Sequence, residues 1–293
     1  MEFAKWEGLG NDYLIIDEAD LPCPLTAHSI NLLCDRHRGI GSDGILLLCA
    51  VTGAVPGAVA RMRIFNPDGS EPEMCGNGVR QFARYLQGRG LVAGSEFTVE
   101  TLAGPIRPSL LADGRVRVDM GEARFGGEAI DHTLLDLPEG AEVVSIPFVF
   151  RGDALEVAAD ITFVDVGNPH CVIPVANPDT VALEVVGPLI ERHPLFPRRV
   201  NVEFISVLPD GAVRMRVWER GVGETQACGT GATAVGVAAV RLGMAADPVV
   251  VRLNGGDLEI VVAGDGHVIM TGPATEVFTG VVADELKGRL GWL

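Results

Sequence analysis

The chain contains one cysteine motif twice, and this repeat constrains the fold more than any other feature of the sequence. The first copy, Met-Cys-Gly-Asn-Gly, occupies residues 74–78, and the second, Ala-Cys-Gly-Thr-Gly, occupies residues 227–231. Both cysteines lie 13 residues after the start of a strand-like segment, Met-Arg-Ile-Phe at 62–65 and Met-Arg-Val-Trp at 215–218. A motif repeated together with its flanking strand indicates two copies of one structural unit.

Each cysteine is followed by a helical pattern. After Cys75, the apolar residues Val79, Phe82, Ala83 and Leu86 have the spacing of one helix face, and a glycine at 88 or 90 can end the helix. After Cys228, residues 232–242 are apolar on nearly all sides, which is typical of a helix enclosed by a sheet. We therefore expect both cysteines to lie at the start of a helix.

Strand signals dominate the rest of the chain. Short segments rich in Val, Ile and Phe, bounded by Gly, Asp or Pro, predict strands at 61–65, 97–101, 115–120, 161–166, 171–175, 213–218, 249–253 and 258–262. The repeat continues through them, because 98–102 resembles 249–253 and 113–116 resembles 265–268. Further helices are expected at 26–37, capped by Thr26, and at 188–193, with Pro188 in the first turn.

These patterns predict an α+β protein of two pseudo-symmetric halves, each a mostly β shell around a helix headed by a cysteine. The first half is expected to span 1–125 and to include the C-terminal segment 276–293. The second is expected to span 126–275, with the crossover at Gly126 and Gly127.

Composition narrows the classes of function. A formal net charge of −16 argues against nucleic acid or an anionic membrane as a partner. The longest small and apolar run, 227–240, is too short to span a bilayer, and residues 1–12 do not resemble a secretory signal, so we expect a cytoplasmic protein. Six cysteines without a Cys-x-x-Cys pair argue against structural zinc and, in a reducing compartment, against disulfides.

A cysteine at a helix start lies beside unpaired backbone N–H groups and the positive end of the helix dipole. This setting favours a thiolate and can hold a carboxylate, and the adjacent glycines let a ligand approach the backbone. One such motif is more typical of a structural thiol, but two at equal spacing favour chemistry. Cys23, Cys34 and Cys49 lack the motif and are expected in the core or without a role. Cys171 follows His170, but neighbouring strand residues point to opposite faces, which argues against a nucleophilic pair.

Four asparagines lie in settings marked by glycine or proline or beside strands: Asn11, Asn66, Asn168 and Asn201. A single asparagine is more often a turn residue, but four together are consistent with a pocket that recognises both an amine and a carboxylate. Glu219 can hold an ammonium group and Arg220 a carboxylate, the alternative being an exposed ion pair in a loop. Of the six histidines, only His170 lies in one of these asparagine segments, and the other five are scattered without ligand spacing.

Six segments in order resemble the diaminopimelate epimerase family, whose members interconvert LL- and meso-diaminopimelate without pyridoxal phosphate in lysine and peptidoglycan-precursor synthesis. They are residues 8–12, 39–44, 63–70, 73–78, 167–172 and 219–231. The family fold has two similar halves, each a β-barrel-like sheet wrapped around a central helix. The chain differs from some members at Gly44, where a glutamine can reach toward the substrate, and at Pro67 and Pro72.

The resemblance implies that Cys75 and Cys228 are the two catalytic bases, one thiolate and one thiol. It implies that His170 and Glu219 orient the ammonium group of the reacting centre and support catalysis. The substrate-binding residues that it implies are Asn11, Asn66, Gly76, Asn77, Asn168, Asn201, Glu219, Arg220, Gly229 and Thr230. It further implies a small-molecule substrate, a homodimer, and neither a cofactor nor a metal ion.

Two alternatives remain at the level of sequence. A proline-racemase-like enzyme would also use paired cysteines, but it would not need Asn66, Asn201 and Arg220 to hold a distant second amino-acid group. A redox or ligand-binding protein would join Cys75 and Cys228 in a regulatory disulfide, although redox pairs usually lie within one local motif.

Overall fold

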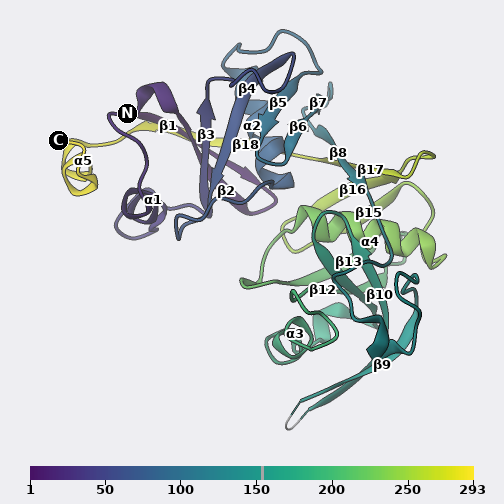
Figure 1. Ribbon diagram of the computed structural model, residues 1–293. Coiled ribbons are helices and arrows are strands. Elements are labelled where there is room, and N and C mark those ends of the chain that lie inside the picture. Colours follow the sequence, from purple (N-terminus) through teal and green to yellow (C-terminus); the bar gives the residue numbers. More distant parts are fainter. Residues whose placement is uncertain (153–154) are drawn as a thin grey trace. The chain divides into compact units, whose positions relative to one another are not determined.

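The computed structural model describes residues 1–152 and 155–293, which form two compact units (Figure 1). Unit 1 comprises Met1–Val118 and Gly272–Leu293, and unit 2 comprises Asp119–Thr271. The division falls within strand β8 (Val116–Glu122), a few residues before the boundary expected at 125 and 126. The C-terminal segment belongs to unit 1 because β18 pairs with the first strand of the chain.

Unit 1 is built on a seven-stranded sheet in the order β18-β1-β2-β3-β4-β5-β6. Its strands are β1 (Glu2–Gly8), β2 (Asn11–Asp17), β3 (Gly44–Cys49), β4 (Ala58–Phe65), β5 (Thr98–Thr101), β6 (Gly104–Ile106) and β18 (Thr275–Val281), and β7 (Ser109–Leu110) pairs with β8. Helix α2 (Gly76–Gly88) packs against β1, β2 and β18. Its predicted apolar face is at most 2% exposed, so burial of Val79, Phe82, Ala83 and Leu86 holds the helix on the sheet.

Unit 2 contains strands in the order β17-β16-β15-β13-β12-β11-β10-β9, with β14 paired to β13. Their bounds are β9 (Ile146–Arg151), β10 (Glu156–Asp165), β11 (Pro169–Pro174), β12 (Asn201–Val207), β13 (Val213–Glu219), β14 (Gly223–Glu224), β15 (Val249–Arg252), β16 (Asp257–Val262) and β17 (His267–Gly272). Helix α4 (Gly229–Arg241) contacts strands on both sides, as Figure 1 shows. Ile260 packs so closely on Gly236 that a Cβ there would lie 2.6 Å from its Cγ2.

The remaining helices are α1 (Ala27–Cys34), α3 (Leu183–Glu191) and α5 (Asp284–Leu290), with 3-10 turns η1 (Glu18–Asp20), η2 (His132–Leu135) and η3 (Pro178–Thr180). Thr26 caps α1 as predicted, but the helix ends at Cys34 because Asp35 turns the chain by accepting the N–H groups of His37 and Arg38. The predicted helix at 188–193 is present, but its predicted bounds are wrong, because the helix runs from Leu183 to Glu191. Helix α3 starts at Leu183 after Ala182, which makes no side-chain cap, and Pro188 lies inside it.

The two units share one topology around their cysteine helices. In unit 1, β2 pairs in parallel with β3, which pairs antiparallel with β4; in unit 2, β11, β12 and β13 are connected in the same way. Tyr13 lies opposite Gly44, and His170 lies opposite Asn201. These registers make Tyr13 and His170 equivalent positions, and they confirm the predicted α+β class with two pseudo-symmetric halves. Among the described residues, no helix is long and apolar enough to cross a membrane.

Candidate active site

Both cysteines are the N-cap residues of their helices. Cys75 precedes α2 with φ −144° and ψ 114°, and Cys228 precedes α4 with φ −126° and ψ 111°. Each Sγ accepts the backbone N–H three residues later, from Gly78 and from Gly231, at 3.4 Å in both cases. The extended N-cap conformation places each sulfur at the positive end of a helix, where the field favours negative charge.

In unit 1, the loop between β1 and β2 brings Asn11 to the start of α2. Asn77 Nδ2 donates to Asn11 Oδ1 at 3.3 Å, and Gln81 Nε2 donates to the backbone oxygen of Asn11 at 2.9 Å. Asn11 in turn donates to Asp43 at 3.0 Å. Asn11, Cys75 and Asn77 are therefore gathered at one helix end, as the resemblance implied for a binding site.

Two side chains of this half were missed by the sequence reasoning. The Tyr13 hydroxyl donates to Cys75 Sγ at 3.4 Å. Arg80 is fully buried and donates to Asn77 Oδ1 at 2.9 Å, to the Gly76 oxygen at 3.3 Å and to the Pro273 oxygen at 3.1 Å. Burial lowers the pKa of Arg80 to about 10, against the opposite influence of Cys75 and Glu7. The sequence signal that could have identified Arg80 is its place next to Val79, in the helix whose apolar face is predicted to be buried.

In unit 2, the turn before β11 brings Asn168 to the start of α4. Asn168 Nδ2 donates to Thr230 Oγ1 at 3.2 Å, and Thr230 Oγ1 lies 3.5 Å from Cys228 Sγ. His170 Nε2 lies 3.0 Å from Asn168 Oδ1. The four predicted residues Asn168, His170, Cys228 and Thr230 therefore form one chain of polar contacts.

A carboxylate that the sequence reasoning missed completes this chain. Glu203 Oε1 lies 2.6 Å from His170 Nδ1, and both side chains are fully buried. Burial raises the pKa of Glu203, although His170 opposes the shift. Burial likewise raises the pKa of Cys228 well above its usual 9.0, and the charges of Glu219 and Glu203 act in the same direction. The electrostatic setting of Cys228 thus favours the thiol.

The expectation for Cys171 is confirmed. It lies in the apolar core of unit 2 with Phe150, Phe163 and Val202, while His170 faces Asn168 and Glu203. Burial raises the pKa of Cys171 well above its usual value, which suits an unreactive thiol.

Asn201, Glu219 and Arg220 lie where β12 and β13 reach the same edge. Asn201 is buried; its amide donates to the Pro169 oxygen at 2.9 Å and accepts the Arg220 N–H at 2.9 Å. Glu219 accepts the hydroxyl of Thr225. Asn201 therefore joins the turn of Asn168 to the segment of Arg220, which positions both.

A cavity of about 720 Å³ opens beside these residues in unit 2. Its lining includes Asn168 and Arg220 together with Arg124, Arg198, Glu122 and Asp165. Arg220 donates to the Arg198 oxygen at 3.1 Å, so its guanidinium is held at the cavity wall. Three arginines and two carboxylates offer partners for both ends of an amino acid.

Asn66 and Gly44 differ from the other predicted positions. Asn66 donates to Ser70 Oγ at 2.9 Å and its N–H donates to the Ser70 oxygen, so its contacts are those of a turn. At Gly44, a Cβ would lie 2.5 Å from the Phe65 oxygen and 2.7 Å from the Tyr13 ring. The space that the first side-chain atom of a glutamine would fill is therefore occupied by Phe65 and Tyr13.

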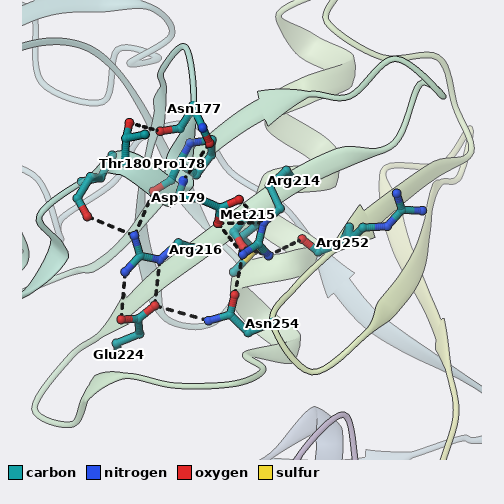
Figure 2. Close-up of polar contacts among 11 residues, drawn as sticks. Asn177, Pro178, Asp179, Thr180, Arg214, Met215, Arg216, Glu224, Arg252 and Asn254 are labelled. Carbon is teal, nitrogen blue, oxygen red and sulfur yellow. Dashed lines mark hydrogen bonds and ion pairs between the residues drawn. The ribbon is translucent and has the colours of Figure 1, made fainter.

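An arginine network holds the hairpin that leads to Cys228 (Figure 2). Arg216 makes a bidentate pair with Glu224 at 2.8 and 2.9 Å and donates to the Pro178 and Val181 oxygens at 3.0 Å each. Arg214 pairs with Asp179 at 2.6 Å. The network connects β13 and β14 to η3. These two strands flank the turn that contains Arg220, directly after Glu219.

No group of three or more His, Cys, Asp and Glu side chains within 1–152 and 155–293 is arranged to hold a metal ion. The six cysteines are all free thiols.

Comparison with known proteins agrees with this architecture. The fold is shared with a probable proline racemase from Agrobacterium radiobacter K84, solved with bound carbonate. That structure is 18% identical, covers 96% of this chain and 92% of its own, and superposes with a TM-score of 0.66, a likeness that shows the fold alone.

Comparison of the sequence identifies the family. The family model for diaminopimelate epimerase matches residues 3–126 and 162–277. A diaminopimelate epimerase from Synechocystis sp. is 47% identical over 96% of this chain and 98% of its own. Another, from Desulforudis audaxviator, is 49% identical with the same coverage. The chain therefore belongs to the diaminopimelate epimerase family.

Proposed function

We propose that this chain epimerises LL-diaminopimelate to meso-diaminopimelate without a cofactor, with Cys75 and Cys228 as the two acid–base groups. The observation that carries the proposal is the repeated geometry of the cysteines in a chain of this family. Each is the N-cap of its helix, and each Sγ accepts one N–H at 3.4 Å.

The chemistry follows from the charge that proton removal creates. One thiolate takes the α-proton, the electron pair is held as a carbanion beside the carboxylate, and the second thiol delivers its proton to the opposite face. Without pyridoxal phosphate, this charge must be stabilised electrostatically. Backbone N–H groups at Gly76 and Asn77, and at Gly229 and Thr230, would bind the carboxylate of the reacting centre at the positive ends of the two helices.

Polar residues of both units would bind the amino groups and the distant carboxylate. Glu219 would hold the ammonium group of the reacting centre. Arg220 at the cavity wall would bind the second carboxylate, with Asn11, Asn66, Asn77, Asn168 and Asn201 completing the polar surroundings. A substrate that lacks the second amino-acid group would leave Arg220 without a carboxylate to bind, and this gives selectivity.

The decisive experiment is deuterium incorporation. The purified protein is incubated with LL-diaminopimelate in heavy water without added cofactor, and the inverted centre is examined by NMR. We expect one solvent deuterium at that centre in the wild type. Cys75→Ala and Cys228→Ala should each lower turnover at least a hundredfold, because positioned acid–base groups contribute about 10²–10⁴. Full epimerisation by either variant would rule out the two-base scheme.

The two other functions are tested in the same preparation. Inversion of the α-carbon of proline would favour the hypothesis of a proline-racemase-like enzyme. A reversible disulfide between Cys75 and Cys228 with no exchange of the α-proton would favour a redox protein. If the two thiols act on one carbon, mild oxidation that joins them should abolish epimerisation, and reduction should restore it.

The protein is also proposed to be a cytoplasmic homodimer. Strand β18 lies at the edge of the unit 1 sheet and exposes Val277, Phe278 and Val281, an apolar edge suited to pairing with a second copy. Light scattering after size exclusion should give twice the chain mass, and Val281→Glu should shift it toward the monomer. A monomeric wild type would remove this proposal.

A further inference from the structure

The buried pair of Glu203 and His170 is used by no step of the scheme above. The parallel register of β11 and β12 places His170 opposite Asn201, so Glu203, two residues further along β12, lies on the same face as Asn201. Glu203 Oε1 lies 2.6 Å from His170 Nδ1 and both side chains have zero exposure. Glu203 Oε2 has no hydrogen-bond partner among the described residues.

The hydrogen bonds determine where the protons lie. Asn168 donates through Nδ2 to Thr230, so its Oδ1 is the atom that faces His170 Nε2. Nε2 must therefore carry a proton and donate it. Nδ1 and Glu203 Oε1 then hold one proton between them, as imidazolium with carboxylate or as neutral imidazole with carboxylic acid. In both arrangements, Glu203 keeps a proton on Nε2.

Unit 1 shows that the fold does not require a carboxylate here. The equivalent registers place Leu46 where unit 2 has Glu203, and Tyr13 where it has His170. The environments match, because a Cβ on Gly78 would meet Leu46 Cδ2 at 3.0 Å and a Cβ on Gly231 would meet Glu203 Oε1 at 3.0 Å. A buried carboxylate costs free energy that a leucine does not, so packing alone does not account for Glu203.

We propose that Glu203 is a positioning residue for the epimerisation: it keeps the proton on His170 Nε2, and so sets the orientation of the Asn168 amide and the Thr230 hydroxyl beside Cys228. The inference rests on the proposed function. It implies that His170 acts through Asn168, because both of its ring nitrogens are engaged. Other titratable groups that act on the pair are Glu219 from β13, Cys228 from the start of α4, and Cys171, next to His170 on β11.

Two substitutions separate proton placement from charge. Glu203→Leu copies the residue of unit 1 and leaves Nδ1 without a partner, so the imidazole proton can move to Nδ1 and the Asn168 amide can turn over. Glu203→Gln can still donate to Nδ1 and keep the proton on Nε2, but it carries no charge. We expect kcat to fall about 10- to 100-fold in Glu203→Leu with little change in KM, and to stay within about fivefold of the wild type in Glu203→Gln.

Nitrogen-15 NMR of the histidine ring gives a readout that does not depend on turnover. We expect a directly bonded proton on Nε2 of His170 in the wild type and in Glu203→Gln, and a mixture of tautomers in Glu203→Leu. Cys171→Ala, a core substitution on the same strand, controls for loss of packing and should keep the wild-type kcat, while thermal unfolding verifies that each variant folds.

The proposal is overturned if Glu203→Leu retains full kcat, if Glu203→Gln is as slow as Glu203→Leu, or if wild-type Nε2 carries no proton. A wild-type protein that does not epimerise diaminopimelate yet shows the protonated Nε2 would count against the proposed function, and the proton placement would stand.

Discussion

At the scale of single residues, the two cysteines share their backbone geometry but differ in their neighbours. Cys75 receives a hydroxyl hydrogen bond from Tyr13, while Cys228 lies beside Thr230 and near the buried carboxylate of Glu203. A helix N-cap therefore supplies a common field, and the side chains of adjacent strands make the two sulfurs chemically distinct.

Substitution of Tyr13 by Phe tests the neighbour of Cys75. It removes the hydroxyl that donates to Sγ at 3.4 Å and keeps the ring that packs over Gly44. A hydrogen bond to a charged group is worth about 1.5–3 kcal/mol, so kcat for epimerisation should fall roughly tenfold or more. The chain has one other tyrosine, Tyr85, and Tyr85→Phe serves as the matched control. Equal kcat in the two variants would remove Tyr13 from the site.

At the scale of elements, loops that carry predicted site residues are held by partly buried ion pairs at their bases. Asp12 accepts Lys5 at 2.7 Å and Arg36 at 2.6 Å beside Asn11. Burial would raise the pKa of Asp12, but the hydrogen bonds of Arg36 and Lys5 lower it. Arg216 has the same function for the hairpin of β13 and β14 (Figure 2). The helices position the cysteines. Within each unit, the ion pairs of Asp12 and of Arg216 hold the loops beside the cysteines.

Arg216→Met should destabilise unit 2 through this hairpin. It removes the bidentate partner of Glu224 and leaves the Pro178 and Val181 oxygens without their donor. We expect the free energy of unfolding in urea to fall by about 2 kcal/mol. The control is Arg151→Met, whose pair with Glu156 has side chains 68% and 65% exposed and should contribute under about 1 kcal/mol. Similar losses in both variants would contradict the assignment.

At the scale of the whole molecule, buried thiols link stability to pH. Burial raises the pKa of Cys49 to about 12, with Glu18 adding to the shift, and raises the pKa of Cys171 and Cys228 well above 9.0. In the unfolded chain, these thiols ionise near 9. Above that pH the unfolded state has lost protons that the folded state retains, so the free energy of unfolding must fall as pH rises.

Urea unfolding between pH 8 and pH 10.5 should show this loss. Each buried thiol contributes a slope of up to about 1.4 kcal/mol per pH unit above pH 9. Cys171→Ala removes one such group, so its curve should decline less steeply by about that amount. Cys23→Ala, which alters an exposed thiol, should leave the slope unchanged. A slope that Cys171→Ala does not alter would mean that Cys171 ionises in the folded protein.

Much of this organisation could be predicted because it is local. The cysteine motif, the apolar spacing after Cys75 and the strand signals depend on neighbours within a few residues, so the two helix starts and the repeat were visible in the sequence. The bounds of helix α3 could not be predicted, because they depend on contacts that are not local. Its start at Leu183 has no capping side chain and depends on packing in the core of unit 2.

The sequence by itself determined the family, the paired cysteines and the division into two similar halves, because the repeat and the motifs consist of consecutive residues. Only the tertiary structure showed that Tyr13 lies against Cys75, that Arg80 is buried beneath Asn77, and that Glu203 lies against His170. These partners are 62, 3 and 33 residues apart, and Tyr13, Arg80 and Glu203 lie outside the motifs. Strand register brings His170 and Glu203 together, and the packing of the whole unit places Tyr13 at Cys75 and buries Arg80.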